Sequence, residues 1–184
     1  MRLVEIRRHS IKQGSGNADL SPAGFELAQQ IGMQQLRGRT FTALFQSPLK
    51  RTQETLQAFA QGAGDFPKIE PLSFPPHLLV STTAEALALW SGVCHEAEAH
   101  GEDMMEAALT KSSLTARSIA YDAAVAFKQW LAEMPNDTQA LVVGHSPFIE
   151  LMMLGLFDRI FPQLSWCEGF RVIEDRATYH WERV

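Results

Sequence analysis

The 184-residue sequence has little of several features that would point to particular classes of protein. It has only two cysteines, Cys94 and Cys167, which are too few for a disulfide framework, so we expect both to be ordinary thiols. Its formal net charge of −5 argues against broad electrostatic binding to nucleic acid or to an anionic membrane surface. A small, local positive pocket remains compatible with that charge.

Long apolar segments are also missing. The longest, residues 149–157, contains Glu150 and is far shorter than the ~20 residues that a membrane-spanning helix needs. The first ten residues carry four charged side chains and no apolar signal core. We therefore expect a cytoplasmic protein with no membrane partner. Its length and its 46% of apolar residues suit one globular domain.

Apolar runs and helical spacings alternate along the chain. Apolar runs predict strands at residues 3–6, 42–45, 68–72, 140–143, 170–174 and 178–183. Helices are expected to begin at Ser21-Pro22, Ser47-Pro48 and Ser146-Pro147, and a long helix is expected over residues 114–134. This alternation predicts one α/β domain over residues 1–184, a three-layer α/β/α sandwich. Its sheet is expected to be mostly parallel, with a C-terminal antiparallel hairpin at one edge and a variable insert at about 73–113.

The ends of three predicted strands carry residues suited to binding an anion. The first strand runs into Arg8 and His9, Arg51 lies in the first turn of the helix after the second strand, and His145 follows the apolar strand at 140–143. The carboxyl ends of parallel strands meet at one edge of a sheet, and the helix N-termini there favour negative charge. We therefore expect these four side chains to surround one phosphate.

Each of these residue types has a chemical use at a phosphate. Arginine offers a planar, permanently charged fork to phosphate oxygens. One histidine can attack phosphorus through a neutral ring nitrogen, and the other can donate a hydrogen bond to the phosphoryl oxygens. In the loop after His9, Ser15 and Asn17 are candidates for substrate contact, although loop polarity explains them equally well.

Four motifs occur in a fixed order at these junctions, at residues 8–10 (RHS), 20–24 (LSPAG), 47–55 (SPLKRTQET) and 142–146 (VVGHS). With them the chain resembles the histidine phosphatase superfamily, the phosphoglycerate-mutase-like enzymes. The resemblance implies that His9 accepts a phosphoryl group as a transient phosphohistidine, which water then hydrolyses. It also implies that Arg8, Arg51 and His145 bind that group without a metal or other cofactor. The partner would be a phosphorylated small molecule or a phosphoprotein.

The chain departs from the family's pattern at two places. Ser10 stands where the family usually has glycine, a small change that could reshape the floor of the pocket. Many members also carry an acidic proton donor after the third strand, and here Glu70, His77 and Glu85 are candidates without any of them standing out. An enzyme without that acid favours a good leaving group, such as that of phosphohistidine. The layout is nearest to the short phosphohistidine phosphatases. Phosphoglycerate mutases are longer than this chain and carry the acid, so we do not expect mutase activity.

The residues also allow alternative interpretations. The same pocket could bind phosphate or a phosphoprotein without turnover. Residues 144–148 resemble a serine-hydrolase nucleophile elbow, but Phe148 occupies the position of its second glycine, so Ser146 is expected to cap a helix. Residues 94–100 contain possible metal ligands, although a solvated surface segment is the favoured interpretation. Arg7 should point to the opposite strand face from Arg8, as a surface or salt-bridge residue.

Overall fold

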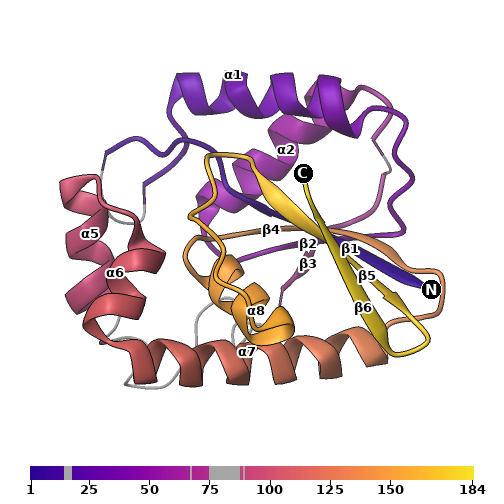
Figure 1. Cartoon of the computed structure of the whole chain (residues 1–184). Coiled ribbons are helices and arrows are strands. Elements are labelled where there is room, and N and C mark those ends of the chain that lie inside the picture. The colour runs from indigo at the N-terminus through magenta and orange to yellow at the C-terminus, as the bar shows by residue number, and fades with distance from the viewer. Residues whose placement is uncertain (15–17, 67, 75–87, 89) are drawn as a thin grey trace. The chain divides into compact units, whose positions relative to one another are not determined.

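The computed structural model describes residues 1–14, 18–66, 68–74, 88 and 90–184 (Figure 1). The chain divides into two compact units. The first comprises Met1–Phe74, Met134–Gly144 and Ser165–Val184, and the second comprises Pro75–Glu133 and His145–Leu164. The single domain over residues 1–184 stays a prediction. Within the described ranges, no helix is long and apolar enough to span a bilayer.

A six-stranded sheet with the strand order β3-β2-β4-β1-β5-β6 forms the centre of the first unit. Its strands are β1 (Arg2–Arg8), β2 (Ala43–Gln46), β3 (Leu72–Ser73), β4 (Gln139–Gly144), β5 (Gly169–Asp175) and β6 (Thr178–Arg183). The strands β1 to β4 pair in parallel, whereas β5 and β6 are antiparallel. The predicted α/β class, with a mostly parallel sheet and an antiparallel C-terminal hairpin, is confirmed.

Two helices cover one face of this sheet. They are α1 (Pro22–Ile31), which continues as a π-helical turn over Gly32–Leu36, and α2 (Lys50–Ala63). Ser21 caps α1 as predicted, because its hydroxyl accepts the N–H of Gly24 at 3.0 Å and Pro22 opens the first turn. The core beneath the helices contains Ala28, Leu36, Phe41, Leu44, Leu56, Phe59, Leu141 and Val143. The two helices lie side by side (Figure 1).

The start of α2 and the extent of β3 differ from prediction. The helix begins at Lys50, not at Pro48, because the Ser47 hydroxyl accepts the N–H of Leu49 and pairs with the hydroxyl of Thr52. Ser47 and Pro48 therefore form the turn before the helix. The third strand consists of Leu72–Ser73 and shares only Leu72 with the expected range 68–72, since Pro71 has no N–H to continue the ladder.

The second unit contains helices only, among the residues described. They are a π-helical turn (Trp90–Cys94), α5 (His95–His100), α6 (Met104–Lys111), α7 (Ser113–Glu133) and α8 (Phe148–Phe157). The long helix expected over 114–134 is confirmed as α7. It packs closely on α8, since a Cβ atom added at Gly155 would lie 1.9 Å from the carbonyl oxygen of Ala120. The segment 94–100, expected to be a solvated surface segment, is only partly so, because Cys94 and Ala97 belong to the core.

The start of α8 also differs from prediction. Helix α8 begins at Phe148 and has no side-chain cap. The hydroxyl of Ser146 instead donates to the carboxylate of Glu150 at 2.6 Å, and the N–H of Leu164 donates to the same oxygen at 2.7 Å. Glu150 is fully buried and requires these donors, so the prediction that Ser146 caps the helix is wrong.

Candidate active site

The ends of β1 and β4 lie side by side in the first unit. Their register continues to the pair Arg8 and Gly144, and the N–H of His9 donates to the carbonyl of Gly144 at 3.0 Å. His9 is therefore the first residue beyond β1, at the carboxyl edge of the sheet. The next residue along the chain from Gly144 is His145, a buried residue that the second unit includes.

The imidazole of His9 contacts the guanidinium of Arg51. The Nε of Arg51, in the first turn of α2, donates to Nε2 of His9 at 3.1 Å. The other ring nitrogen, Nδ1, lies 2.7 Å from the carbonyl oxygen of Ser10. Because a carbonyl only accepts, Nδ1 carries the hydrogen, and Nε2 presents a lone pair on the side of Arg51. The structure thus brings Arg8, His9 and Arg51 together, as predicted from the strand ends.

His9 is uncharged at neutral pH in this environment. Burial is the largest cause that lowers its pKa, to about 3. The hydrogen bond to Ser10 works in the opposite direction, and the positive charges of Arg51, Arg8 and Lys12 lower the pKa further. A neutral imidazole with its lone pair at Nε2, the nitrogen that accepts from Arg51, is the form that can attack phosphorus once the Arg51 guanidinium turns to the phosphoryl oxygens.

The low pKa of His9 should make the fold sensitive to acid. Between pH 6.5 and about 3 the unfolded chain binds a proton at this residue that the folded chain does not bind. The free energy of unfolding should therefore fall as pH falls, by up to about 1.4 kcal/mol per pH unit from this group. Urea unfolding between pH 4 and 5.5 should give a shallower slope for His9→Gln than for the parent. Equal slopes would contradict the low pKa.

Ser10, at the position where glycine is usual, connects the site to both helices. It is fully buried; its hydroxyl donates to the carbonyl of Gly24 in α1 at 2.6 Å, and its N–H donates to the hydroxyl of Thr55 in α2 at 3.0 Å. Thr55 in turn donates to the carbonyl of Arg51 at 2.7 Å. The serine hydroxyl is therefore bound to α1, and the chain around His9 is fixed from two sides.

Removing this hydroxyl should weaken the fold. We expect Ser10→Ala to lower the free energy of unfolding by about 1 kcal/mol, because one buried hydrogen bond to Gly24 is lost. Chemical denaturation of the two proteins measures the difference. Ser113→Ala, at an exposed serine, is the control that should change little. An unchanged midpoint for Ser10→Ala would show that the hydroxyl contributes nothing.

The structure adds Trp166 to the site, a residue that sequence reasoning missed. The guanidinium carbon of Arg8 lies 3.8 Å from the centroid of the indole ring. The imidazole of His9 lies 5.5 Å from the same ring, between centroids, at an interplanar angle of 42°. Trp166 stands in the loop before β5, outside every motif that the sequence offered.

Arg7 is part of a buried charge cluster behind the site. As predicted, it forms a salt bridge, with Glu5 at 2.7 Å, but it is 1% exposed and not a surface residue. Glu5, which is fully buried, also accepts from Arg39 at 3.2 Å and from Arg171 at 2.9 Å. Arg7 donates further to the carbonyl of Cys167 at 2.9 Å. The cluster joins β1, β5 and the loop that carries Trp166.

The two cysteines are buried and form no disulfide. Burial raises the pKa of each thiol to about 11, with the Glu150 carboxylate adding to the effect at Cys94. At neutral pH both are therefore protonated and poor nucleophiles. The prediction that they are ordinary thiols is confirmed.

The proton donor is not found among the candidates that the structure describes. Predicted residues Ser15, Asn17, His77 and Glu85 lie outside the described residues. Glu70 is exposed and precedes β3, whereas Arg51 follows the carboxyl end of the parallel strand β2. Glu70 thus lies toward the opposite end of the strands from His9. Glu70 is therefore not placed to protonate a leaving group at His9.

Glu168, near Trp166 in the chain, is held as a carboxylate. Partial burial acts to raise its pKa, but hydrogen bonds from Arg183 and from the N–H of Ser165, together with the charge of Arg183, hold the pKa below its ordinary value. The bond from Arg183 measures 2.6 Å. Glu168 is therefore poorly suited to donate a proton at neutral pH.

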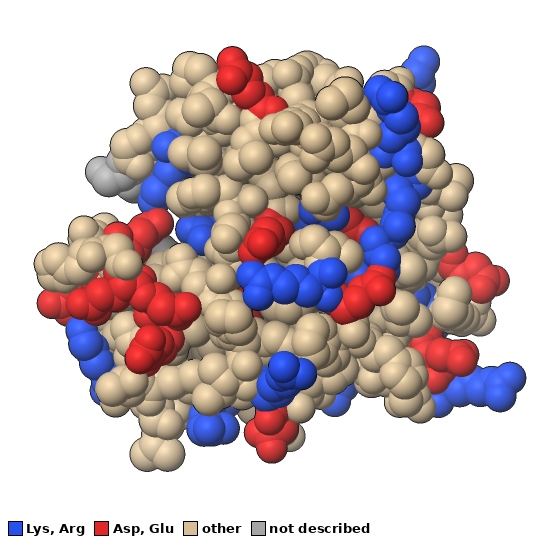
Figure 2. All heavy atoms as spheres, turned by 45° about the horizontal axis from the view of Figure 1, so that its top comes forward, with Lys and Arg blue, Asp and Glu red and all other residues tan. Residues whose placement is uncertain are grey.

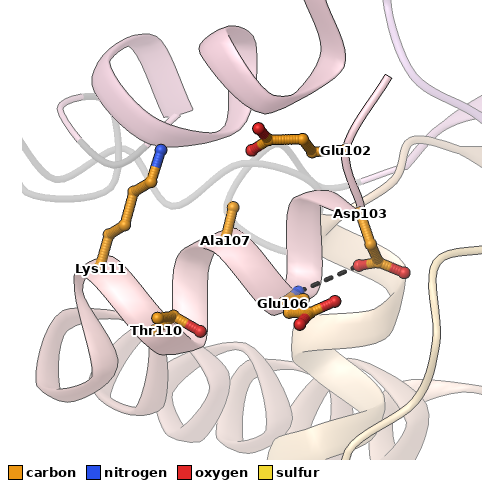
Figure 3. Close-up of a pocket in the computed structure, with 6 residues that line it drawn as sticks. All are labelled: Glu102, Asp103, Glu106, Ala107, Thr110 and Lys111. Atoms are coloured by element: carbon orange, nitrogen blue, oxygen red, sulfur yellow. Dashed lines mark hydrogen bonds between the residues drawn. The ribbon is translucent and has the colours of Figure 1, made fainter. Parts of the chain in front are cut away.

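A separate hollow of about 280 Å³ lies within the second unit, beside α6 (Figure 3). Its lining residues are Glu102, Asp103, Glu106, Ala107, Thr110 and Lys111. Asp103 caps α6 by accepting the N–H groups of Met105 and Glu106, and its other oxygen accepts the N–H of Gln163. These contacts give Asp103 a structural role. In the described part of the chain, no group of three or more His, Cys, Asp or Glu residues is placed to hold a metal ion.

Residues 4–73, which contain Arg8, His9 and Arg51, match the sequence profile of the histidine phosphatase superfamily (branch 1). No curated protein matches the sequence. Solved structures match over the whole chain. Phosphoglycerate mutase from Bacillus anthracis str. Sterne has 17% identity and a TM-score of 0.68, over 100% of this chain and 92% of that one.

The chain has the histidine phosphatase fold. Phosphoserine phosphatase from Entamoeba histolytica, solved with 3-phosphoglyceric acid, matches at 21% identity and a TM-score of 0.62, over 94% of this chain and 91% of that one. The protein histidine phosphatase SixA, solved with tungstate, matches at 12% identity and a TM-score of 0.59, over 98% and 94%. The resemblance predicted from the sequence is thereby confirmed. Phosphatases and a mutase share this fold, so the fold by itself does not choose between them.

Proposed function

We propose that the protein is a metal-independent phosphatase that hydrolyses a phosphomonoester or a phosphoramidate through a covalent phosphohistidine at His9. The observation that carries the proposal is the contact of Arg51 Nε with His9 Nε2 at 3.1 Å, in a neutral and buried ring. The guanidinium that binds a phosphoryl oxygen and the nitrogen that attacks phosphorus thus lie next to each other. Arg8, bound on the indole of Trp166, adds a second positive charge.

The reaction follows from these groups in two steps. Arg8, Arg51 and His145 hold the phosphoryl oxygens while Nε2 of His9 forms a bond to phosphorus, and the bond from phosphorus to the leaving oxygen or nitrogen breaks. The leaving group keeps that electron pair and takes a proton from solvent. Water then attacks phosphorus, the bond to Nε2 breaks, and a water proton is released with inorganic phosphate. His9 returns to its neutral form, with its hydrogen on Nδ1.

The proposed substrate class is a phosphorylated small molecule or a phosphoprotein with a good leaving group. Phosphohistidine suits a site without a strong acid, since its leaving nitrogen can be protonated before cleavage. SixA is described as a protein histidine phosphatase and the Entamoeba protein as a phosphoserine phosphatase. Chain length does not argue against a mutase, because this chain covers 92% of the Bacillus mutase. The argument for hydrolysis depends on the proton donor, which is not found among the described candidates Glu70 and Glu168.

A turnover screen tests the proposal. The substrates are para-nitrophenyl phosphate, phosphoserine, 3-phosphoglycerate and a phosphohistidine protein, with vanadate as the inhibitor. We expect phosphate release from at least one substrate, inhibition by vanadate and full activity in the control His95→Ala, at an exposed histidine. Vanadate binding with no turnover of any substrate would favour the phosphate-binding module instead. Phosphate transfer between the positions of 3-phosphoglycerate would indicate a mutase.

A further inference from the structure

Trp166 contacts two residues of the proposed phosphate site at once. Its indole ring lies 3.8 Å from the guanidinium carbon of Arg8 and 5.5 Å, between centroids, from the ring of His9. A guanidinium that stacks on an aromatic face keeps its N–H groups, which lie in its plane, for hydrogen bonds at its edge. Trp166 therefore fixes the orientation of Arg8 without using the donors that would bind phosphate oxygens.

The loop that carries Trp166 is bound to β1 by two hydrogen bonds. The N–H of Arg8 donates to the carbonyl of Glu168 at 2.8 Å, and Arg7 donates to the carbonyl of Cys167 at 2.9 Å. Gly169 allows the close approach, since a Cβ atom there would lie 2.0 Å from the carbonyl oxygen of Ile6. The backbone around Trp166 thus follows the end of the strand that presents His9.

Contacts within the loop and with β6 fix it further. The N–H of Ser165 donates to the carboxylate of Glu168 at 2.8 Å, and Arg183 on β6 donates to the same oxygen at 2.6 Å. Glu168 is therefore held from two sides, two residues beyond Trp166. A loop with this many fixed groups holds an indole in one place, as a positioning role requires.

We infer that Trp166 is a positioning residue of the phosphate site, which holds the plane of the Arg8 guanidinium and shields one side of the His9 imidazole from water. The inference rests on the proposed function, because it assigns Trp166 a role in the same reaction. In this role Trp166 affects phosphate binding through the orientation of Arg8 and affects the protonation of His9 by excluding water. It does not contact the phosphoryl group.

The first test separates the aromatic face from simple bulk. Trp166→Leu fills much of the space but offers no π face to Arg8, so kcat/KM should fall roughly tenfold and vanadate should bind more weakly. Trp166→Phe keeps a smaller face and should lose only about two- to threefold. Trp181→Leu is the matched control, because Trp181 lies on β6 and packs on Phe170. It should leave kcat/KM within about twofold.

The second test is the pH profile of kcat/KM. The positive groups that face His9 are Arg8 on β1, Arg51 on α2 and Lys12 in the loop after β1, and all remain in the variants. Trp166→Leu admits water to the imidazole, so the pKa of His9 should rise toward its ordinary value. The acidic limb of the profile should then move upward by about half a pH unit or more. A role limited to stability would lower the melting temperature and leave this limb in place.

The outcomes separate this inference from the function beneath it. If His9→Ala is inactive while folded Trp166→Leu keeps both its kcat/KM and its acidic limb, the inference about Trp166 is overturned and the phosphatase proposal stands. If His9→Ala remains fully active, both are overturned. Should Trp166→Leu fail to fold, Trp166→Phe decides the matter: a two- to threefold loss with a shifted limb supports the role, and parent-like values overturn it.

Discussion

Replacing His9 with alanine is expected to lower the rate of phosphate release by at least about a thousandfold. The variant lacks the nitrogen Nε2, which accepts from Arg51 at 3.1 Å and is the only proposed site of bond formation to phosphorus. Arg8 and Arg51 remain, so the affinity for phosphate or vanadate should change by no more than about tenfold. The expected signature is therefore a loss of kcat with binding largely kept. Steady-state kinetics and vanadate titration of the same preparation measure both.

His180→Ala is a suitable control for this experiment, because His180 is exposed on β6. It should behave as the parent protein in both measurements. Substantial turnover in His9→Ala, at more than about a tenth of the parent rate, would remove His9 as the nucleophile. A loss of vanadate binding equal to the loss of turnover would instead indicate that His9 only shapes the pocket.

Removing the carboxylate of Glu5 is expected to be the most damaging substitution for stability. Glu5 is fully buried and accepts from three arginines, Arg7, Arg39 and Arg171. Without it, the guanidinium of Arg7 stays buried with no opposite charge beside it. Breaking one side of a buried ion pair costs about 3–5 kcal/mol, a large part of the 5–15 kcal/mol of a typical domain. Urea unfolding of Glu5→Gln should show this loss.

Glu182→Gln is the matched control for Glu5→Gln. Glu182 also pairs with Arg171, but its side chain is half exposed, and exposed pairs contribute about 1 kcal/mol or less. Acidic and basic side chains lie beside one another on the surface that Figure 2 draws, where similarly small effects are expected. A loss of less than about 1 kcal/mol for Glu5→Gln would contradict the account of the cluster.

The sequence predicted the strand ends well, because the signals there are local. The run at residues 140–143 is apolar on both faces and became β4, and the residues that follow each strand are fixed by chain order alone. The contact of Arg51 with His9 could be expected for the same reason. The sequence could not predict which ring nitrogen accepts from Arg51. That nitrogen is Nε2, because the carbonyl of Ser10 holds the hydrogen on Nδ1.

The three Ser-Pro pairs illustrate where local signals fail. Ser21 caps its helix as predicted, whereas Ser47 and Ser146 do not. The hydroxyl of Ser47 instead forms a hydrogen bond with the hydroxyl of Thr52, and the hydroxyl of Ser146 donates to the carboxylate of Glu150. The local sequence is the same in each case, so only the packing of the following helix decides the outcome.

Contacts between distant parts of the chain were invisible to pattern analysis. The ring of Trp166 packs near that of His9, although the two residues are far apart in the sequence. Glu5 accepts hydrogen bonds from Arg39 and Arg171, which lie 34 and 166 positions further along the chain. A lone tryptophan in a loop carries no local sign of such a partner. Glu5 did offer a signal, because a charged residue in the middle of the apolar run 3–6 needs buried partners, but the run does not say which residues these are.

The most direct measurement is to trap the enzyme after brief reaction with a labelled phosphodonor and to map the modified residue by peptide mass. Neutral His9 at Nε2 should carry up to one phosphoryl group per chain, labile in acid and stable in base, and the label should be absent from His9→Ala. Phosphate release at the parent rate with no label on His9, or with the label on another residue such as Ser146, would contradict the proposed chemistry.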